Sequence, residues 1–205
     1  MKISKEKAEA NRAALVETAS RLFQQKGIDG VGVAEISKSA GLTHGALYAH
    51  FPSKEALAAE ALAWGLEQGK AKLYSGAADG EPDLDRFLSD YLSVDNRDNY
   101  AEHCAMAASA SEVGRQDAVT SAAFANGYMV LVRVFERRVG AGNPKVDALA
   151  TALGIVAAMV GALSVARATA KANPELSAQV LLGMRSMIDT AMGKSTVPPI
   201  ESTPS

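Results

Sequence analysis

The chain has 205 residues, of which 48% are hydrophobic and 5% aromatic, so it can bury the core of one large domain or of two small ones. Its single cysteine excludes an internal disulfide, and the start M-K-I-S-K-E-K lacks the apolar run of a secretory signal, which predicts a cytoplasmic protein. Residues 1–54 hold eight Lys or Arg against five Asp or Glu, and the rest of the chain is acidic. This asymmetry fits both a polyanion-binding head and an ordinary solvated surface.

The first predicted helix runs from Lys5 to Lys26 and stops at Gly27, a residue type that readily takes the left-handed conformation of a helix end. The apolar residues on one side of this helix are Leu15, Val16, Ala19, Leu22 and Phe23. This stripe predicts the face that the helix turns toward a core.

Two short helices joined by a tight turn are predicted next, in the stretch G-V-A-E-I-S-K-S-A-G-L-T-H-G-A-L-Y-A-H-F (residues 32–51). Gly41 is suited to end the first helix, and the Thr43 hydroxyl is suited to cap the second by accepting from amides two or three residues on. Leu42 and Leu47 can form a hydrophobic staple across this cap, which fixes the angle between the two helices.

The second short helix has an outward face with almost no charge. Leu47 and Phe51 are expected to turn inward. The residues left on the outside are then His44, Gly45, Tyr48 and Ala49. An uncharged face of this kind indicates a binding partner.

Further helices are predicted along the rest of the chain, with no strand pattern, which favours an all-α fold. Pro52 blocks helix after Phe51, and Ser53 caps a long helix that runs to about Tyr74, followed by a linker, residues 76–82. The later predicted helices are Asp83 to Val94, Tyr100 to Val113, Gln116 to Val139, Pro144 to Ala172 and Pro174 to Met192. Each of the last two follows a capping asparagine, Asn143 or Asn173, and has proline at its first position, and the helix from Pro144 is expected to be roughly 40 Å long. The polar run D-N-R-D-N (95–99) is predicted as a loop, and residues 193–205 are predicted as a disordered tail.

The segment from Ala148 to Ala166 has nineteen residues without a charge, enough by length to span a bilayer. Seven of these residues are alanine, so the segment is less hydrophobic than a membrane span, and we expect a buried helix of a soluble bundle and no membrane contact. Small residues spaced four apart allow another helix to approach closely. The candidate dimer-interface residues are Gly154, Ala158, Gly161, Ala162, Leu182 and Met187.

Two short helices with a glycine-containing turn are typical of the helix-turn-helix motif, whose second helix enters the major groove of DNA. Gly45 would allow close approach, His44 can bond to a base edge, and Ala49 can touch a thymine methyl group. The candidate phosphate contacts are Tyr48, His50 and Lys54.

The same stretch resembles a known family signature. The segment G-L-T-H-G-A-L-Y-A-H-F-P-S-K-E-A-L closely resembles that of the TetR family of bacterial transcriptional regulators, and the resemblance extends from T-A-S-R-L-F-Q-Q-K-G to about Leu62. It implies an all-helical homodimer with a DNA-binding head (residues 1–52), a ligand-binding and dimerisation body (residues 53–192), and an interface made by the last two helices of each subunit. It further implies base contacts from His44 and Gly45, and backbone contacts from Tyr48, His50 and Lys54.

Two positions depart from the family pattern. Most relatives have a threonine at position 32 that caps the first short helix and touches a phosphate, whereas Gly32 can offer only its backbone. His44 stands where lysine is common, so its contact with DNA is expected to be weaker and pH-dependent. The complete set of candidate DNA contacts is Gly32, Thr43, His44, Gly45, Ala46, Tyr48, Ala49, His50 and Lys54.

A regulator of this kind needs a ligand that favours one separation of its two heads, because only differential affinity between states can shift an equilibrium. DNA requires recognition helices about 34 to 36 Å apart. We expect a small apolar effector of unknown identity in the body, and ordinary core packing is the alternative for every candidate residue. The candidates are Trp64, Phe87, Tyr91, Tyr100, His103, Cys104, Met106, Phe124, Tyr128 and Met159.

Cys104 lies in the segment H-C-A-M-A-A-S-A-S-E-V-G-R. This segment resembles G-C-P-x-A-A-L-x-S-E-hydrophobic-A-R, found in a subset of TetR-like regulators, although Ala105 replaces the usual proline. Some regulators with a cysteine in this region sense electrophiles or oxidants, and a helix N-terminus favours the thiolate. The two hypotheses for Cys104 are therefore a sensor and a packed, inert cysteine.

Other classes of protein have little support in the sequence. We expect no enzyme, cofactor or metal site, because the chain has no Gly-rich phosphate loop or nucleophile motif, and His44 and His50 do not share a helix face. The expected partners are double-stranded operator DNA, a second copy of the chain and a small-molecule effector. The remaining alternative is a helical, dimeric small-molecule-binding module that does not bind an operator.

Overall fold

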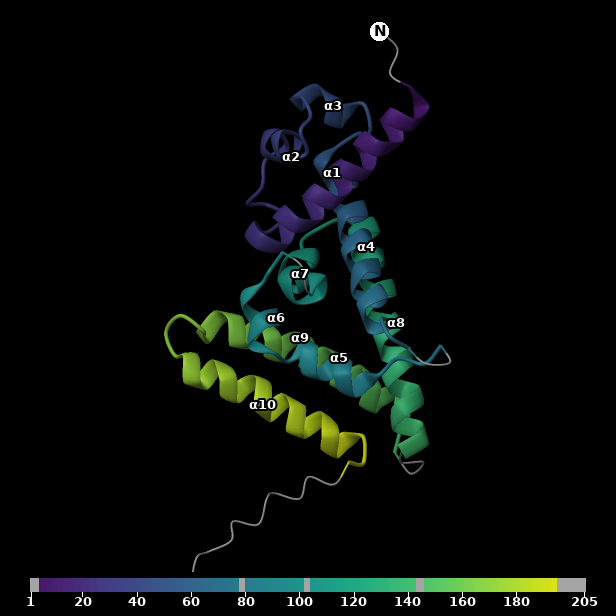
Figure 1. Ribbon diagram of the computed structural model, residues 1–205, viewed down its shortest axis with the longest axis vertical. Coiled ribbons are helices and arrows are strands. Elements are labelled where there is room, and N and C mark those ends of the chain that lie inside the picture. Colours follow the sequence, from purple (N-terminus) through teal and green to yellow (C-terminus); the bar gives the residue numbers. More distant parts are fainter. Residues whose placement is uncertain (1–3, 78–79, 102–103, 143–145, 195–205) are drawn as a thin grey trace, which may run out of the picture. The chain divides into compact units, whose positions relative to one another are not determined.

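The computed structural model describes residues 4–77, 80–101, 104–142 and 146–194. Within these ranges the regular elements are ten α-helices, which confirms the all-α prediction (Figure 1). Their bounds are α1 Lys5–Lys26, α2 Val33–Ser39, α3 His44–Tyr48, α4 Lys54–Leu73, α5 Leu84–Tyr91, α6 Val94–Asp98, α7 Ala105–Val113, α8 Ala118–Gly142, α9 Ala148–Thr169 and α10 Pro174–Ala191.

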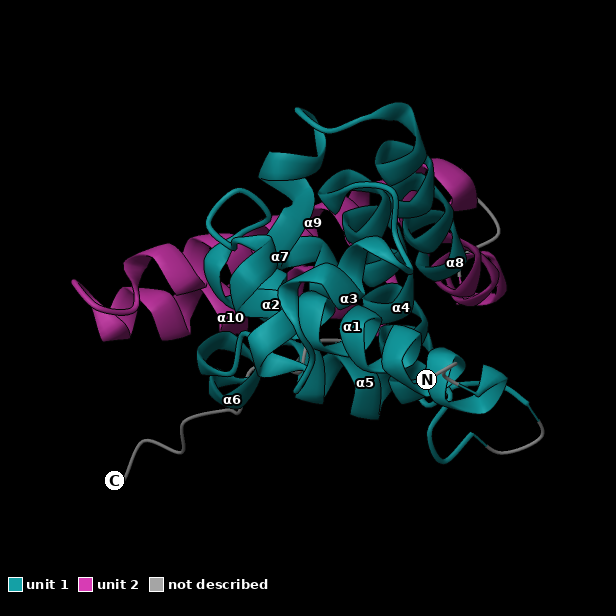
Figure 2. Cartoon of the chain, turned by 90° about the horizontal axis from the view of Figure 1, so that it is seen from above, with its two compact units in different colours: residues 1–131 teal, residues 132–205 magenta. Residues whose placement is uncertain are grey.

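By its internal contacts the chain divides into two compact units, residues 1–131 (unit 1) and residues 132–205 (unit 2), with the boundary inside α8 (Figure 2). The predicted head, residues 1–52, lies wholly within unit 1. The predicted domain boundaries after residues 52 and 192 stay predictions. Most of the predicted tail, residues 195–205, lies outside the described residues.

Several helix ends follow from local capping, as predicted. Helix α1 has the predicted bounds, and Gly27 ends it with φ 79° and an amide that donates to the carbonyl of Phe23 at 2.9 Å. The Ser53 hydroxyl caps α4 by accepting from the amide of Ala56 at 3.2 Å. The Asn173 side chain caps α10 by accepting from the amide of Leu176 at 3.0 Å, with Pro174 at the first helical position.

The loop predicted for residues 95–99 is wrong, because most of that run forms α6. Ser93 starts this helix by accepting from the amide of Asn96 at 3.0 Å. Helix α5 accordingly ends at Tyr91 rather than at Val94. The run D-N-R-D-N looks like a loop by composition, but a serine cap two residues before it is enough to start a helical turn.

Three other predicted helix starts also need correction. Helix α7 begins at Ala105 rather than Tyr100, with Cys104 as its N-cap, and α8 begins at Ala118 after Asp117. Helix α9 begins at Ala148, because the Asp147 side chain accepts from the amide of Ala150 at 3.0 Å, and the predicted cap at residue 143 lies outside the described residues. With 22 residues α9 is about 33 Å long rather than the predicted 40 Å or so.

One hydrophobic core in unit 1 joins the first four helices. Leu47 and Phe51 are fully buried in it, as predicted, and Trp64 packs against it from α4. The other buried members are Leu15, Val16, Ala19, Phe23, Ile28, Val31, Ile36, Leu57, Ala58 and Ala61. Burying both residues holds the two short helices against α1 and α4.

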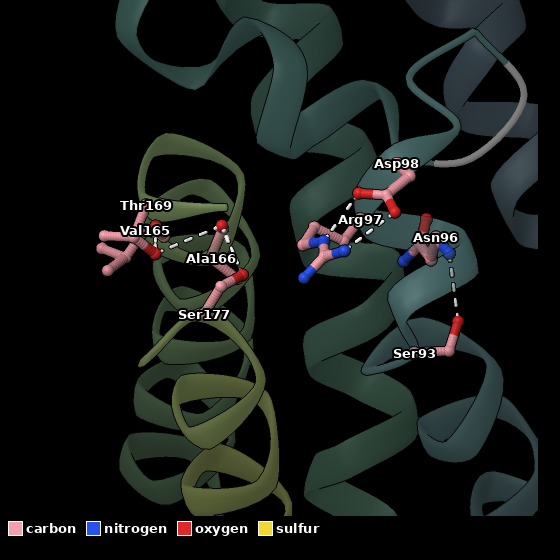
Figure 3. A network of polar contacts seen from close by, with 8 residues as sticks. All are labelled: Ser93, Asn96, Arg97, Asp98, Val165, Ala166, Thr169 and Ser177. Carbon is pink, nitrogen blue, oxygen red and sulfur yellow. Dashed lines mark hydrogen bonds and ion pairs between the residues drawn. The ribbon is translucent and has the colours of Figure 1, made fainter. Parts of the chain in front are cut away.

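In unit 2, helices α9 and α10 pack side by side (Figure 1). The buried Ser177 hydroxyl of α10 donates to the carbonyl of Ala166 in α9 at 2.7 Å (Figure 3). In the same figure, the Thr169 hydroxyl donates to the carbonyl of Val165 at 2.9 Å. The hydrogen bond from Ser177 ties the start of α10 to the end of α9.

Helices α8 and α9 are each long and apolar enough, by length and composition, to cross a membrane. Core helices of soluble proteins meet the same criterion, so this is weak evidence for a membrane span.

Candidate nucleic-acid interface and ligand cavity

The turn between α2 and α3 is fixed by backbone hydrogen bonds. Gly41 has φ 71°, its amide donates to the carbonyl of Lys38 at 3.1 Å, and the amide of Leu42 donates to the carbonyl of Ser37 at 2.8 Å. This is the Schellman pattern of a helix end, for which glycine is the usual residue. The predicted role of Gly41 is confirmed, and the turn sets the direction in which α3 starts.

Thr43 stands at the N-cap position of α3, but its side chain makes no capping hydrogen bond, so the predicted hydroxyl cap is wrong. The Thr43 carbonyl instead accepts from the amide of Ala46 at 3.0 Å. Helix α3 has only five residues, and the position of Leu47 in the core holds it in place. The Thr43 side chain itself is exposed.

The outward face of α3 is exposed, as predicted. His44, Gly45, Tyr48 and Ala49 are exposed, and Tyr48 retains 53% of its accessible surface. The rings of His44 and Tyr48 meet edge to face with centroids 5.6 Å apart, and a Cβ at Gly45 would meet no other atom within 4 Å. The face is therefore an open, uncharged surface with one ordered pair of rings. Ala46 and His50 are half-buried beside it.

Charged side chains hold the short helices to their neighbours. Arg12 of α1 donates to both carboxylate oxygens of Glu60 in α4, at 2.5 and 2.6 Å, and its guanidinium lies 4.8 Å from the ring centroid of Phe51. Lys26 at the end of α1 pairs with Glu35 of α2 at 2.5 Å. These contacts join α1 to α4, to α2 and to Phe51, which follows α3.

Two further candidate DNA contacts lie at helix starts. Gly32 is the N-cap of α2 with φ −88°, offers no side-chain cap, and has open space where a Cβ would be. Lys54 is the first residue of α4 and is half-buried. The next residue, Glu55, accepts hydrogen bonds from its own backbone amide and from the Ser53 side chain, and these bonds lower the pKa of Glu55.

A cavity of about 540 Å³ lies within unit 1, in the size range typical of small-molecule sites. Residues of α4, α5, α6, α7 and α8 line it. Its large apolar lining residues are Leu66, Leu73, Phe87, Met106, Val130 and Leu131. A cavity with this lining suits a largely apolar ligand.

The polar part of the lining includes one direct contact between two candidate effector residues. The Tyr91 hydroxyl lies 3.1 Å from the Cys104 sulfur, and the sulfur also accepts from the amide of Ala107 at 3.3 Å. The charged lining residues include pairs at 3.2 Å between Lys70 and Glu67 and at 3.9 Å between Arg86 and Asp90. Because these charges lie close to opposite charges, they do not favour an ion of either sign.

Four of the ten candidate effector residues line this cavity: Phe87, Tyr91, Cys104 and Met106. The other described candidates do not line it. Trp64 packs on the core around Leu47, Phe124 packs on a separate cluster of Leu62, Ala105 and Val113, and Met159 is buried in α9. The remaining described candidates outside the lining are Tyr100 and Tyr128. His103 lies outside the described residues.

Sequence reasoning missed Asn96 of α6 (Figure 3), which is 2% exposed. It is one of the residues that line the cavity. Its side-chain amide donates to the carbonyl of Tyr91 at 2.5 Å. Beside it, Arg97 donates to both carboxylate oxygens of Asp98 at 2.6 and 2.8 Å, which lowers the pKa of Asp98. The capping serine Ser93 was the available signal for this helix.

Unit 2 has small and apolar residues accessible on α9 and α10. Gly154 and Gly161 are exposed, Ala158 and Ala162 are half-buried, and a Cβ on either glycine would meet no other atom within 4 Å. The large candidates of α10 are Leu182 and Met187, which are 70% and 48% exposed. Val165, 49% exposed, continues the spacing of Gly154, Ala158 and Gly161 and was missed by the sequence reasoning.

Comparison with known proteins matches the N-terminal part of the chain to a protein family. The family model of bacterial regulatory proteins of the tetR family matches residues 15–61, from the middle of α1 into α4. The transcriptional regulator AcrR of Shigella flexneri is 36% identical over 94 residues, which cover 44% of this chain and 39% of that protein. TtgR of Pseudomonas putida is 41% identical over 54 residues, 26% of each chain. The chain thus matches about two fifths or less of the length of these curated relatives.

The likeness to solved structures extends over nearly the whole chain. A TetR transcriptional regulator from Chloroflexus aurantiacus is 25% identical, with a TM-score of 0.76 over 93% of this chain and 98% of that one. The reduced form of E. coli NemR is 21% identical, with a TM-score of 0.73 over 91% of this chain and 99% of that one. The chain thus matches the tetR family of bacterial regulatory proteins in the sequence of its head, and it resembles a solved regulator of that family in fold along its length.

Proposed function

We propose that the protein is a cytoplasmic, DNA-binding transcriptional regulator. As a homodimer it represses transcription from a palindromic operator until a small, largely apolar effector enters the cavity of unit 1. The observation that carries this proposal is the exposed, uncharged face of α3, which starts from a turn fixed by hydrogen bonds.

At the DNA, His44 and Gly45 contact base edges, with Ala46 and Ala49 close to the groove floor. The open space at Gly45 supports this assignment, because a helix must approach closely to bring so short a side chain to the bases. Tyr48, His50 and Lys54 contact the sugar-phosphate backbone.

Two further contacts are to phosphates. Thr43 has an exposed hydroxyl that is not used as a helix cap, so it can donate to a phosphate. Gly32 contributes its backbone amide at the start of α2.

Dimerisation uses the accessible residues of α9 and α10. Glycines and alanines at 154, 158, 161 and 162 let a helix of the second copy approach closely, and the exposed Leu182 and Met187 become buried against it. Operator binding depends on this interface, because each head offers few base-edge hydrogen bonds and two heads must act together.

The effector binds among the apolar side chains of the cavity, with Tyr91 as the hydrogen-bonding group that orients it. Phe87 and Met106 provide the apolar surface on α5 and α7. A drug-sized molecule without net charge matches the volume of about 540 Å³ and the paired charges of the lining.

The regulator is tested by selecting double-stranded fragments from a random pool over the purified protein at physiological salt. A palindrome is the expected product. In a gel-shift titration with that fragment, His44→Ala and Tyr48→Ala should each weaken binding by about tenfold or more while the variants stay folded and dimeric. Gln25→Ala, at an exposed position of α1, is the matched control and should bind as the wild type does. Unchanged affinity in both α3 variants would reject the assignment.

The alternative function is a dimeric small-molecule-binding module that does not bind an operator. The observation that favours it is Gly32, which removes both a helix cap and a phosphate contact. Selection that returns no shared sequence, together with a folded dimer, would support the module.

Modification of Cys104 is a second possible trigger for release from DNA. The sulfur lines the cavity and accepts a hydrogen bond from the amide of Ala107 in the first turn of α7. If Cys104→Ser loses DNA in response to an electrophile as the wild type does, Cys104 is not the sensor and is simply packed.

A further inference from the structure

Helix α7 connects the cavity to the segment that leads into α2. At its first turn, Cys104, Ala105 and Met106 line the cavity. At its last turn, Glu112 accepts a hydrogen bond at 2.8 Å from the backbone amide of Ile28, in the loop between α1 and α2. One short helix therefore touches both the proposed ligand and the start of the helix-turn-helix motif.

The contact at Glu112 is close on both oxygens of its carboxylate. One oxygen accepts from Ile28, and the other lies against Gly27, where a Cβ would come within 2.3 Å of it. Gly27 has φ 79°, a conformation that favours glycine, so the backbone at this point is both unusual and tightly covered. Ile28 itself is 4% exposed and belongs to the core that holds α2 and α3.

The negative charge of Glu112 does not stabilise either of the two helices that it touches. It lies in the last turn of α7 and against the last residues of α1, and negative charge is unfavourable at the C-terminal end of a helix. A residue whose charge opposes both helix dipoles, and which is nevertheless positioned against a backbone amide, indicates a role other than local stability.

The first turn of α7 is packed so closely against α4 that its displacement must be felt by the neighbouring helices. A Cβ on Gly65 of α4 would lie 3.1 Å from the Cβ of Ala105 and 2.8 Å from the hydroxyl of Ser20 in α1. Helices α1, α4 and α7 thus come so close at Gly65 that an added methyl group would be crowded. Close-packed interiors of this kind transmit displacement rather than absorb it.

We infer that Glu112 is the positioning residue through which occupation of the cavity alters the α1–α2 loop, and with it the placement of α2 and α3. A ligand that displaces the first turn of α7 pulls the carboxylate from Ile28 and releases the loop. This inference rests on the proposed effector site, and it names the route by which that site regulates the head.

The test uses the only cysteine of the chain to place a defined group in the cavity. The full-length protein is labelled at Cys104 with N-ethylmaleimide, and amide hydrogen exchange is measured for residues 28–33 before and after labelling. In the wild type, labelling should raise exchange of this segment by about fivefold or more. In unlabelled Glu112→Ala, loss of a charge-assisted hydrogen bond should raise exchange at Ile28 by about ten- to a hundredfold, with no further rise on labelling.

Two variants guard against a merely structural effect. Ser111→Ala changes an exposed neighbour on α7 and should respond to labelling as the wild type does. Glu112→Gln keeps an acceptor for the Ile28 amide, but the hydrogen bond has about half the strength of one to a carboxylate. This variant should fold, and labelling should raise its amide exchange by an amount between those of the wild type and Glu112→Ala. A wild-type segment that does not respond to labelling, or a full response in both Glu112 variants, would overturn the inference.

A second readout separates this inference from the proposed function. On the selected palindrome, labelling should weaken binding of the wild type by about fivefold or more and leave binding of Glu112→Ala unchanged. If neither protein binds any DNA, the regulator proposal fails, while the exchange data still decide whether Glu112 couples the cavity to the loop.

Discussion

Gly65 and Gly69 lie one turn apart on α4, and replacing each of them with alanine should change the free energy of unfolding in opposite directions. A Cβ on Gly69 would meet no other atom within 4 Å, so Gly69→Ala gains the helix propensity of alanine without a clash, about 1 kcal/mol. A Cβ on Gly65 would lie 2.8 Å from the Ser20 hydroxyl and 3.1 Å from the Cβ of Ala105. Overpacking of that kind costs about 1 to 3 kcal/mol, so after the same gain Gly65→Ala should destabilise by roughly 1 kcal/mol.

The pair is measured by urea unfolding at one fixed protein concentration, because a dimer makes apparent stability depend on concentration. The quantity of interest is the difference between the two variants, about 1 to 3 kcal/mol, in which the common propensity term cancels. The two unfolding temperatures should then differ by several degrees, since a chain of this size shifts by about 2 to 4 °C per kcal/mol. If Gly65→Ala stabilises as much as Gly69→Ala, then α1 and α7 do not approach α4 as closely as described.

The other predictions concern helix starts. Gly32→Ser supplies a side-chain cap to α2 in open space at φ −88°, and should stabilise the protein by about 0.5 to 1 kcal/mol and tighten operator binding by adding a phosphate donor. Unfolding and gel-shift titrations check both effects, and weaker binding would show that a side chain at this position clashes with DNA. The pKa of Asp117 is lowered by hydrogen bonds from the amides of Thr120 and Val119, so its cap of α8 stabilises above the usual aspartate pKa and is lost as pH falls through the lowered value. Urea midpoints below about pH 4 should therefore fall less steeply in Asp117→Asn than in the wild type.

Elements whose ends depend on neighbouring residues in the chain could be predicted from the sequence. The stop at Gly27, the cap at Ser53 and the Asn173-Pro174 start all depend on a side chain and amides within a few residues. The turn at Gly41 is of the same kind, because only the backbone conformation at that residue decides it. The helix-turn-helix could be predicted because every one of its signals is local.

The failures have a different physical origin. Residues 95–98 are polar, but they form α6, where Asn96 is buried against the carbonyl of Tyr91. No pattern of hydrophobicity marks a helix whose buried side chain is an amide. In the same way, Thr43 has the right type for a cap, yet its side chain makes no capping bond, which depends on a rotamer that the sequence does not encode.

The lining of the cavity in unit 1 could be predicted only in part, because large apolar residues serve packing and binding equally well. Phe87 and Met106 line the cavity, whereas Trp64 and Phe124, of similar character, fill cores elsewhere in unit 1. What separates the two groups is the direction of each side chain relative to neighbouring helices. That direction is a property of the packed structure and not of residue type.

The outward face of α3 in unit 1 and the accessible residues of α9 in unit 2 are both exposed surfaces that include glycine and carry little charge. Each exposes glycine and short side chains where a surface without a partner would be expected to carry charge. In the proposed function, the exposed face of α3 lets the backbone come close to bases but leaves few hydrogen bonds per head, so one head alone would bind DNA weakly and with little selectivity. On α9 such a surface would let a second helix come close enough to form the proposed dimer, and two heads at one fixed spacing would then supply the selectivity that one lacks. The proposed function therefore makes the glycines of α9 as necessary for operator recognition as Gly45, although of these glycines only Gly45 would contact DNA.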